Sequence, residues 1–433
     1  MNNNELADKK NYKDWCNKKL KDVLKKTETG VWGDKPGEND NNVKVLRATN
    51  FGENKILLED VAERSISDSK MNKKLKKGNI IVENSGGSKD QPVGRVLYFN
   101  LCGEFFSGNF LKTLIPNKKE VNSYFLYQLL DYLYWRGDTL SLQTNTTNIR
   151  NLQFQSYLNI DLNIPPLREQ QKIASVLYNL DKIIQETEEI IEKTKRGKRG
   201  LMQDLFKRGY YNHEEFKENR IGSRKYQMPS SWELLPIGKI GKVITGDTPS
   251  TKNENNFGND YPFVTPEDLK NNKYITSIRR GLTKEGLEKV KEIPKGAVMM
   301  DCIGSDLGKV AIANRKLATN QQINSILPGD KIDSEFLYYS LQFMSDVIKS
   351  QAGSTATPII RKSSFSNLEL FIPEIEEQKK IATVLADFDK KISYEKKYNK
   401  KLKKLKKGLM QDLLTGKVRT NDKPIEIIEE VID

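Results

Sequence analysis

Residues 164–207 read IPPLREQQKIASVLYNLDKIIQETEEIIEKTKRGKRGLMQDLFK, and residues 372–415 read IPEIEEQKKIATVLADFDKKISYEKKYNKKLKKLKKGLMQDLLT. These two stretches align without a gap at a shift of 208 residues, and 21 of the 44 aligned positions are identical. The regions before them also correspond, with small gaps, since residues 123–130 match residues 334–341. A repeat of this length shows that the chain is a tandem duplication.

Each copy of the segment predicts one long helix. Prolines stand where a first helical turn tolerates them, Glu169 favours the N-terminus, and apolar residues recur at steps of three and four. This spacing is typical of a coiled-coil seam. The predicted seam residues are Ile173, Leu177, Leu180, Ile184 and Ile191 in the first copy and Ile381, Leu385, Phe388, Ile392 and Leu402 in the second.

Pairing of the two helices with each other follows from their length. At about 1.5 Å per residue each helix would extend about 60 Å, which exceeds what one small domain can cover. If the halves are related by a pseudo-twofold axis, the helices run antiparallel, as an antiparallel coiled coil, and hold the globular regions apart. A surface helix packed on its own domain is the alternative.

The expected fold class is α+β, with two tandem globular domains that are each followed by a long helix. Strand-like apolar runs between turns, such as residues 79–83 and 309–313, make the globular domains mostly β. The expected order is a first domain over 1–163 with 1–12 disordered, a first helix over 164–208, a linker over 209–228, a second domain over 229–371, a second helix over 372–416 and a tail over 417–433.

Composition narrows the class of function. The 433 residues carry a formal net charge of +14, which favours a polyanionic partner, with nucleic acid first. The chain has one histidine, His213, in a polar stretch, where we expect a solvated loop residue. A hydrolytic triad and zinc sites with several histidines are thereby excluded, and we expect no metal and no cofactor.

The cellular setting follows from cysteine usage and hydropathy. The 3 cysteines stand in unrelated contexts, so neither a disulfide framework nor a paired-cysteine metal site can be built from them. No window approaches about 18 uninterrupted apolar residues, and the first residues lack the pattern of a secretory signal. We therefore expect a cytoplasmic protein with no membrane segment.

Each globular half contains polar segments suited to a DNA reader. Arginine, lysine, asparagine and glutamine can pair with base edges, while hydroxyl and amide groups hold phosphates. The lysine-rich stretch 400–407 is more ambiguous, because such a run is usually a solvated helix face. The predicted DNA-binding residues are Ser88, Lys89, Gln91, Gln143, Asn145, Asn148 and Arg150 in the first half, and Thr248, Ser250, Lys252, Gln321, Gln322, Thr355, Arg361 and Lys362 in the second.

The sequence contains no complete catalytic motif. The stretch that begins at Gly304 and ends at Val310 resembles a phosphate-binding loop, but it has three residues between its glycines and valine in place of the required Ser or Thr. Neither a methyltransferase tetrapeptide nor a nuclease carboxylate constellation is found. We expect no catalytic residues and no catalysis by this chain alone.

The duplicated motifs resemble those of a known family. Pro-Pro-Leu-Arg-Glu-Gln-Gln-Lys-Ile-Ala and Pro-Glu-Ile-Glu-Glu-Gln-Lys-Lys-Ile-Ala, the Gly-Leu-Met-Gln-Asp-Leu that closes both helices and the loop 245–250 are similar to the specificity (S) subunit of type I restriction-modification systems. The resemblance covers nearly the whole chain, in the order of target-recognition domain, helix, target-recognition domain, helix. One departure is Trp32, which stands where the second half has a hydroxyl residue.

The resemblance implies a non-catalytic subunit that binds double-stranded DNA. Its two recognition domains would each read half of a bipartite target, while the helices set the gap between the halves. Two modification (methyltransferase) subunits would dock on the helices, over an edge that includes Tyr178 and residues 200–205, and an ATP-dependent restriction subunit would join them. A structural coiled-coil adaptor with two protein-binding heads is the alternative, although it leaves the net charge and the polar loops unexplained.

Overall fold

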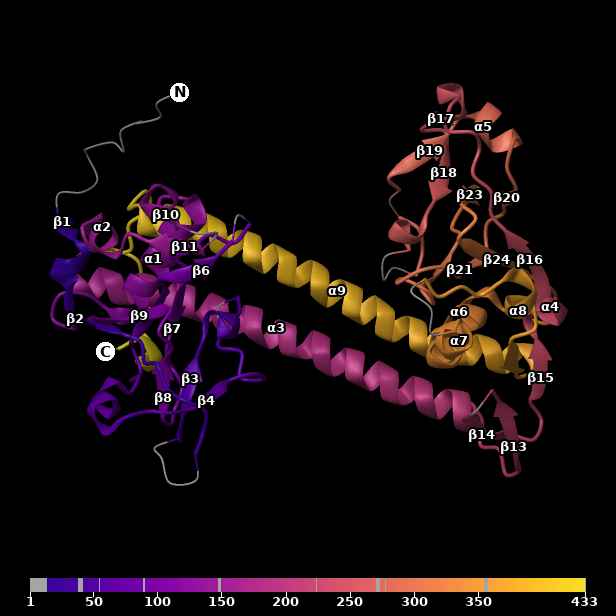
Figure 1. Cartoon of the computed structure of the whole chain (residues 1–433), viewed down its shortest axis with the longest axis horizontal. Coiled ribbons are helices and arrows are strands. Elements are labelled where there is room, and N and C mark those ends of the chain that lie inside the picture. Colours follow the sequence, from indigo (N-terminus) through magenta and orange to yellow (C-terminus); the bar gives the residue numbers. More distant parts are fainter. Residues whose placement is uncertain are drawn as a thin grey trace. The chain divides into compact units, whose positions relative to one another are not determined.

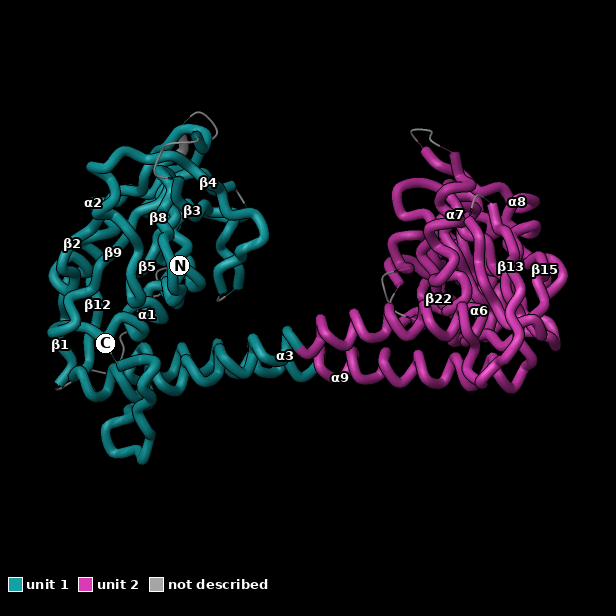
Figure 2. The backbone as a smooth tube through the Cα atoms, turned by 90° about the horizontal axis from the view of Figure 1, so that it is seen from below, with its two compact units in different colours: residues 1–189, 397–433 teal, residues 190–396 magenta. Residues whose placement is uncertain are grey.

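The computed structural model describes residues 14–37, 42–53, 55–88, 90–146, 149–222, 224–269, 273–276, 278–353 and 357–432. The segment 1–12, for which disorder is expected, lies outside them. The chain forms two compact units, residues 1–189 with 397–433 (unit 1) and residues 190–396 (unit 2), as Figure 2 shows. Each unit contains one globular domain and a part of both long helices, α3 (Leu167–Arg208) and α9 (Ile375–Leu414).

Unit 1 is built on antiparallel and mixed sheets (Figure 1). Helix α1 (Ser123–Arg136) packs on the largest sheet, and α2 (Phe154–Leu158) follows later in the chain. The largest sheet has the order β2 (Leu24–Thr29), β9 (Leu111–Pro116), β5 (Ile80–Glu83), β7 (Val96–Tyr98); the second has β4 (Ala62–Ser65), β3 (Asn42–Leu46), β8 (Phe105–Ser107); the third has β10 (Gln143–Thr146), β11 (Ile149–Leu152), β6 (Ser85–Gly87); and β1 (Cys16–Lys19) pairs with β12 (Asp161–Ile164).

Unit 2 repeats this plan. Its helices besides the two long ones are α4 (Ile237–Ile240), α5 (Lys284–Glu288), α6 (Ser334–Phe343), α7 (Ser345–Gln351) and α8 (Lys362–Ser366). Its sheets have the orders β16 (Gly241–Thr245), β24 (Ile323–Pro328), β21 (Val298–Asp301), β22 (Val310–Ile312); and β17 (Phe257–Gly258), β19 (Arg280–Leu282), β18 (Tyr261–Val264), β23 (Leu317–Thr319), β20 (Glu292–Ile293); while β15 (Glu233–Pro236) pairs with β25 (Glu369–Ile372).

The duplication predicted from the sequence is confirmed by matching topology. In each unit a four-stranded antiparallel sheet adjoins a second sheet with one parallel pair, β3 with β8 in unit 1 and β18 with β23 in unit 2. The first three residues of β5 and of β21 are apolar and buried, because both faces of these strands are covered. Ile80 and Val82 of β5 face the core that contains α1, whereas Ile81 faces a separate core with Leu46 and Phe105.

The two long helices pack together antiparallel within each unit, which confirms the predicted fold class. In unit 1, Asp181 pairs with Lys406 and Glu188 pairs with Lys403, so the two numberings run in opposite directions. A cluster of Leu180, Ile184 and Leu402 lies between them. In unit 2, Lys198 pairs with Asp389, and Gly197 lies beside the Phe388 ring.

The remaining predicted seam residues lie either in the core of a globular domain or further along the helices. Ile173 and Leu177 belong to the globular core of unit 1, as Ile381 and Leu385 belong to that of unit 2. The helix ends are therefore embedded in the cores of the globular domains rather than in a separate seam. Further along the helices, Ile191 and Ile392 are buried and Phe388 is half-buried.

Each globular domain is held by the second half of the other copy's helix. Asp181 of the first repeat accepts hydrogen bonds from Tyr124 Oη and Gln128 Nε2 of α1, both at 2.7 Å, and pairs with Lys406 of the second repeat at 2.7 Å. In unit 2, Asp389 accepts from Tyr339 Oη of α6 at 2.6 Å and pairs with Lys198 of the first repeat at 2.6 Å. The shift of 208 residues relates Asp181 to Asp389 and Lys198 to Lys406.

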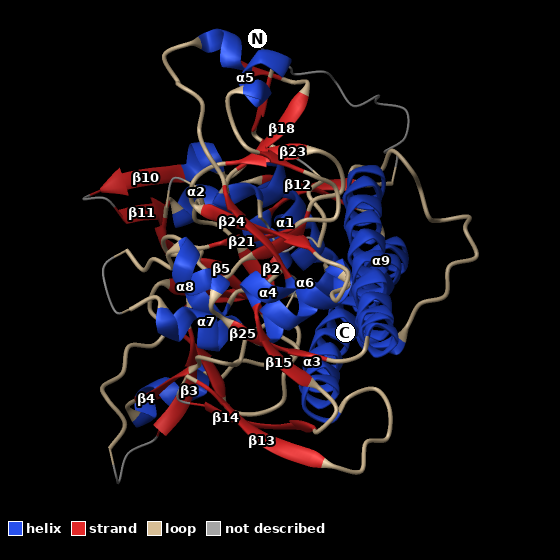
Figure 3. Ribbon diagram, turned by 90° about the vertical axis from the view of Figure 1, so that its right-hand side faces the viewer, coloured by secondary structure: helices blue, strands red, loops and turns tan. Residues whose placement is uncertain are grey.

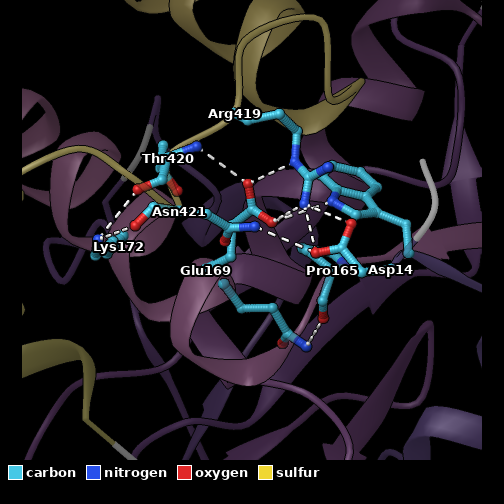
Figure 4. A network of polar contacts seen from close by, with 9 residues as sticks. Asp14, Pro165, Glu169, Lys172, Arg419, Thr420 and Asn421 are labelled. Atoms are coloured by element: carbon cyan, nitrogen blue, oxygen red, sulfur yellow. Dashed lines mark hydrogen bonds and ion pairs between the residues drawn. The ribbon is translucent and has the colours of Figure 1, made fainter. Parts of the chain in front are cut away.

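Residues 417–432 pack back onto the globular domain of unit 1 (Figure 4). Arg419 donates to Glu169 Oε1 at 2.9 Å and to both carboxylate oxygens of Asp14 at 2.8 Å, while Lys172 Nζ donates to the carbonyls of Thr420 and Asn421. The hydrogen bond from Arg419 holds the pKa of Asp14 below its usual value. Val431 is buried in the same core as α1.

The segment 209–228 holds the corresponding place in unit 2. It contains β13 (Phe216–Ile221) and all but the last residue of β14 (Arg224–Pro229), which pair as the hairpin seen in Figure 3. Before the hairpin, Tyr210 N and His213 Nε2 lie 2.8 and 2.9 Å from Glu377 Oε1. The prediction that His213 is a solvated loop residue is wrong, because its side chain is 17% exposed and lies against this carboxylate.

Candidate nucleic-acid interface

In unit 1, the small sheet β10-β11-β6 brings most of the predicted residues together. Gln143 and Asn145 belong to β10, Arg150 belongs to β11, and Arg150 is paired with Gly87 of β6. Figure 3 shows β10 and β11 side by side as a hairpin. Residues more than fifty positions apart in the sequence thus share one surface, since β6 precedes β10 by that distance.

Side-chain hydrogen bonds order part of this surface. Gln143 Nε2 donates to the Val93 carbonyl at 3.2 Å, and its Oε1 accepts from Arg150 Nη1 at 3.4 Å. Beyond β6, the exposed Ser88 and Gln91 close a turn, in which Ser88 N donates to the Gln91 carbonyl at 2.8 Å. Lys89 and Asn148, also predicted to contact DNA, lie outside the described residues.

In unit 2, the loop after β16 meets the loop between β23 and β24. Thr248 Oγ1 donates to Gln321 Oε1 at 2.7 Å, and Asn320 Nδ2 donates to Gln322 Oε1 at 2.8 Å. Thr248 and Gln321 are exposed, as is Ser250, whose carbonyl accepts from Asn256 Nδ2 at 2.9 Å. Lys252 lies further along this loop and is exposed. The two loops therefore present hydroxyl and amide groups to the solvent.

Cys302 connects these loops to Arg361. Its backbone N–H donates to the Gln322 carbonyl at 2.9 Å, and its carbonyl accepts from Ile360 N at 2.9 Å. Arg361 follows directly as the N-cap residue of α8, and both it and Lys362 are exposed. Thr355 lies outside the described residues. The described predicted residues of unit 2 thus gather around one set of loops.

Backbone hydrogen bonds show which positions of the two units correspond. Leu152 N donates to the Asn84 carbonyl at 2.8 Å, just as Ile360 N donates to the Cys302 carbonyl. Arg361 therefore corresponds to Gln153, the N-cap residue of α2, and not to Arg150. Arg150 and Arg361, the two arginines among the predicted DNA-binding residues, therefore occupy positions that do not correspond between the units.

Buried groups behind the loops differ in their partners. Glu83 pairs with Arg95 at 2.6 Å, whereas the equivalent Asp301 accepts a hydrogen bond from Ile303 N at 3.2 Å and is fully buried. Burial raises the pKa of Asp301 to about 6. Burial also raises the pKa of the Cys302 thiol to about 12, so this cysteine is a neutral thiol and no nucleophile.

One part of the surface was not predicted from the sequence. Loop 107–110 of unit 1 occupies the place of 319–322 in unit 2, because Gly30 N donates to the Leu111 carbonyl as Gly246 N donates to the Ile323 carbonyl. Lys70 and Lys73 of the 3-10 helix Asp68–Lys73 donate hydrogen bonds to Trp32, in the neighbouring loop after β2, and to Thr29, the last residue of β2. An alignment of the two halves of the sequence, with a gap that matches Leu111 to Ile323, could have identified this loop.

Neither a metal-binding cluster nor a membrane-spanning helix is found in the described part of the chain. No group of three or more His, Cys, Asp or Glu side chains there could hold a metal ion. Among the helices that the structure describes, none has the length and apolar character needed to cross a membrane.

The chain matches a known family over most of its length. The model of the type I restriction modification DNA specificity domain matches residues 12–196 and again residues 229–404. A protein of Methanocaldococcus jannaschii named as the MjaX specificity subunit is 26% identical over 416 residues, which cover 94% of each chain. The MjaIX specificity subunit of the same organism is 39% identical over 197 residues, which cover 44% of each chain.

A solved structure shows the same fold. The type I restriction-modification S subunit from M. genitalium superposes with a TM-score of 0.60 at 15% identity, covering 94% of this chain and 97% of that one. Two recognition domains in tandem with paired long helices define the class of a duplicated DNA specificity protein. The chain belongs to the family of type I restriction-modification DNA specificity subunits.

Proposed function

We propose that this chain reads a bipartite sequence in double-stranded DNA, with one half-site for each recognition domain. The observation that carries the proposal is that the four-stranded sheets of the two units have equivalent strand orders, while equivalent loop positions carry different residues. A shared scaffold places each set of loops alike, and different side chains on it read different bases. In this proposal the first recognition domain spans residues 1–163 and the second spans residues 229–371.

The chemistry of the loops supports base recognition. Arg150 and Arg361 can each donate two hydrogen bonds to a guanine edge, and Gln143 and Gln321 can pair with adenine. Thr248, Ser250 and Ser88 suit phosphate oxygens, as do the lysines around them. The net charge of +14 supplies the favourable electrostatic contribution that all DNA binding requires.

The long helices act as spacer and docking platform in this proposal. Modification subunits would cover the edge that contains Tyr178 and residues 200–205, of which Leu201 and Met202 are half-buried. Relatives in this family are named as specificity subunits of type I restriction enzymes, which supports modification and restriction subunits as partners. Catalysis would then reside in those partners, in the cytoplasm where the DNA is.

The test is DNA binding by the complex of this chain with its co-expressed modification subunits. We expect sequence selection from a random duplex library to return two fixed segments separated by a gap of constant length. Affinity for random duplex should fall steeply as salt rises, because phosphate contacts release counterions. An adaptor with protein-binding heads would show no sequence selection. Methyl transfer or DNA cleavage by the isolated chain would contradict the non-catalytic role.

A further inference from the structure

The two units carry different chemistry at one equivalent pair of loops. In unit 2, the loop after β16 presents Thr248, and the loop before β24 presents Gln321 and Gln322. In unit 1, the loop after β2 presents Trp32, and the loop before β9 presents Phe110. Hydroxyl and amide groups in one unit are thus replaced by aromatic rings in the other.

Close backbone approach shows that the loops after β2 and β16 correspond. A Cβ added to Gly30 would lie 1.8 Å from the Gly108 carbonyl oxygen, and one added to Gly246 would lie 2.2 Å from the Thr319 carbonyl oxygen. Both glycines are therefore pressed against the neighbouring loop at the same level of the sheet. Trp32 and Thr248 each stand two residues after these glycines.

The loops before β9 and β24 correspond through their carbonyl groups. Phe110 O accepts a hydrogen bond from Asn84 N at 2.9 Å, and Gln322 O accepts one from Cys302 N at 2.9 Å. Phe110 O also accepts from Ser85 N at 3.1 Å, and Ser85 begins β6. Phe110 is therefore directly continuous with the sheet that carries Arg150.

Both aromatic side chains are exposed. The exposed fraction is 65% for Trp32 and 52% for Phe110, which is high for aromatic residues. Exposed rings on two neighbouring loops beside a polar candidate interface indicate a surface that becomes covered on binding. Their backbone is firmly held, since Val31 N donates to the Ser107 carbonyl at 2.7 Å.

Lysines surround the loop that carries Trp32. Lys70 Nζ donates to the Trp32 carbonyl at 2.8 Å, and Lys73 Nζ donates to Thr29 Oγ1 at 3.0 Å. Lys112 lies opposite Thr29 in the β2–β9 register. Burial and the charge of Lys73 lower the pKa of Lys112, so positive charge is crowded here. An exposed aromatic ring on a loop held by lysine ammonium groups matches a duplex, which offers apolar base surfaces between phosphates.

We propose that Trp32 and Phe110 contact bases of the first half-site through their rings, where unit 2 uses hydrogen bonds from Thr248 and Gln322. This inference rests on the proposed function and adds a class of contact to it. The partner of the rings is an apolar surface of DNA, either a thymine methyl group in the major groove or the face of a base at a partly unstacked step.

The test uses the complex of the full chain with its modification subunits and sequence selection from a random duplex library. We expect Trp32→Ala and Phe110→Ala each to weaken binding to the selected DNA about 5- to 150-fold, and the double variant to weaken it further, since a base contact contributes about 1–3 kcal/mol and a factor of ten is 1.4 kcal/mol. Base preference should be lost within the first half-site alone. Thr248→Ala, the matched variant, should change only the second.

Two further measurements separate folding from recognition. Trp135→Ala is the control, because Trp135 is 47% exposed and stacks with Lys407 away from these loops. With the unaltered protein, replacing thymine by uracil in the first half-site reports a methyl contact, and increased fluorescence of 2-aminopurine placed there reports unstacking. We expect a response from one of these DNA probes, which require no change to the protein.

Several results would overturn the inference. Unchanged affinity and preference in the double variant would exclude the rings from DNA contact, as would silence of both DNA probes. Loss of the modification subunit from the complex with DNA preference unchanged would show that the rings bind protein instead. In each of these cases the unaltered complex still selects a split sequence, so the proposed function stands. Failure of the unaltered complex to select any sequence would instead refute that function.

Discussion

The ion pairs that join each long helix to the other copy's domain differ in burial, and stability should follow this difference. In unit 1 the side chains of Lys406 and Asp181 are 6% and 10% exposed. In unit 2 those of Lys198 and Asp389 are 14% and 29% exposed. Removing one partner of a buried pair leaves an uncompensated charge, which costs about 3–5 kcal/mol. A carboxylate that remains in contact with water costs less stability when its partner is removed.

We therefore expect Lys406→Met to destabilise unit 1 by about 3–5 kcal/mol. Lys198→Met, the matched variant in the other copy, should destabilise unit 2 by about 1–2 kcal/mol, because water can still reach Asp389. Asp181 keeps its hydrogen bonds from Tyr124 and Gln128, and combining Lys406→Met with Asp181→Asn should cost less than the sum of the two changes.

Hydrogen exchange read by mass spectrometry measures each unit separately, which one unfolding curve of a two-unit chain does not. Protection of the α1 amides should fall by about two to three and a half powers of ten in Lys406→Met, at about 1.4 kcal/mol per power of ten. The α6 amides of the same variant should change little. Equal losses for both lysine variants, or a loss below about 1 kcal/mol for Lys406→Met, would refute the reasoning from burial.

Three further predictions concern recognition, pH and spacing. Arg361→Ala should weaken binding by about 1–3 kcal/mol at the second half-site alone, as measured by competition with half-site variants, and unchanged specificity would remove Arg361 from the interface. Burial raises the pKa of Asp301 to about 6 from an ordinary 3.8, so its contribution to the free energy of unfolding is fully present below about pH 4 and is lost as pH rises through 6. Denaturation measured across this pH range should show a loss of up to about 3 kcal/mol. The loss should be absent in Asp301→Asn and present in the control Asp306→Asn. Seven residues inserted into both helices near Thr187 and Glu395 add about 10 Å, so the selected gap should lengthen by about three base pairs, and an unchanged gap in a folded variant would show that the helices are not the ruler.

The sequence predicted the long helices well because their signal is local. Apolar residues at steps of three and four persist through α3 and α9, and this period produces a helix whatever lies nearby. The buried strands β5 and β21 were visible as apolar runs for the same reason. The duplication strengthened each of these predictions, since a pattern that occurs twice is seldom accidental.

The candidate interface was only partly visible. Gln143 and Arg150 were chosen for their side-chain chemistry, and the structure places both in one sheet with β6. Phe110 was overlooked because aromatic residues are ordinarily core residues, and only the fold shows that its ring is exposed. His213 was misjudged because its partner, Glu377, is distant in the sequence.

The sequence by itself determined that two equal halves exist, that each ends in a helix of about forty residues, and that apolar stripes must be covered. Only the tertiary structure decided that Asp181 meets Lys406, that Glu169 meets Arg419, and that Phe110 stands where the other unit has Gln322. The physical reason is range. Helical periodicity is set by neighbours three or four residues away, whereas a hydrogen-bond partner is set by which surfaces pack together, and residues two hundred positions apart meet only after folding.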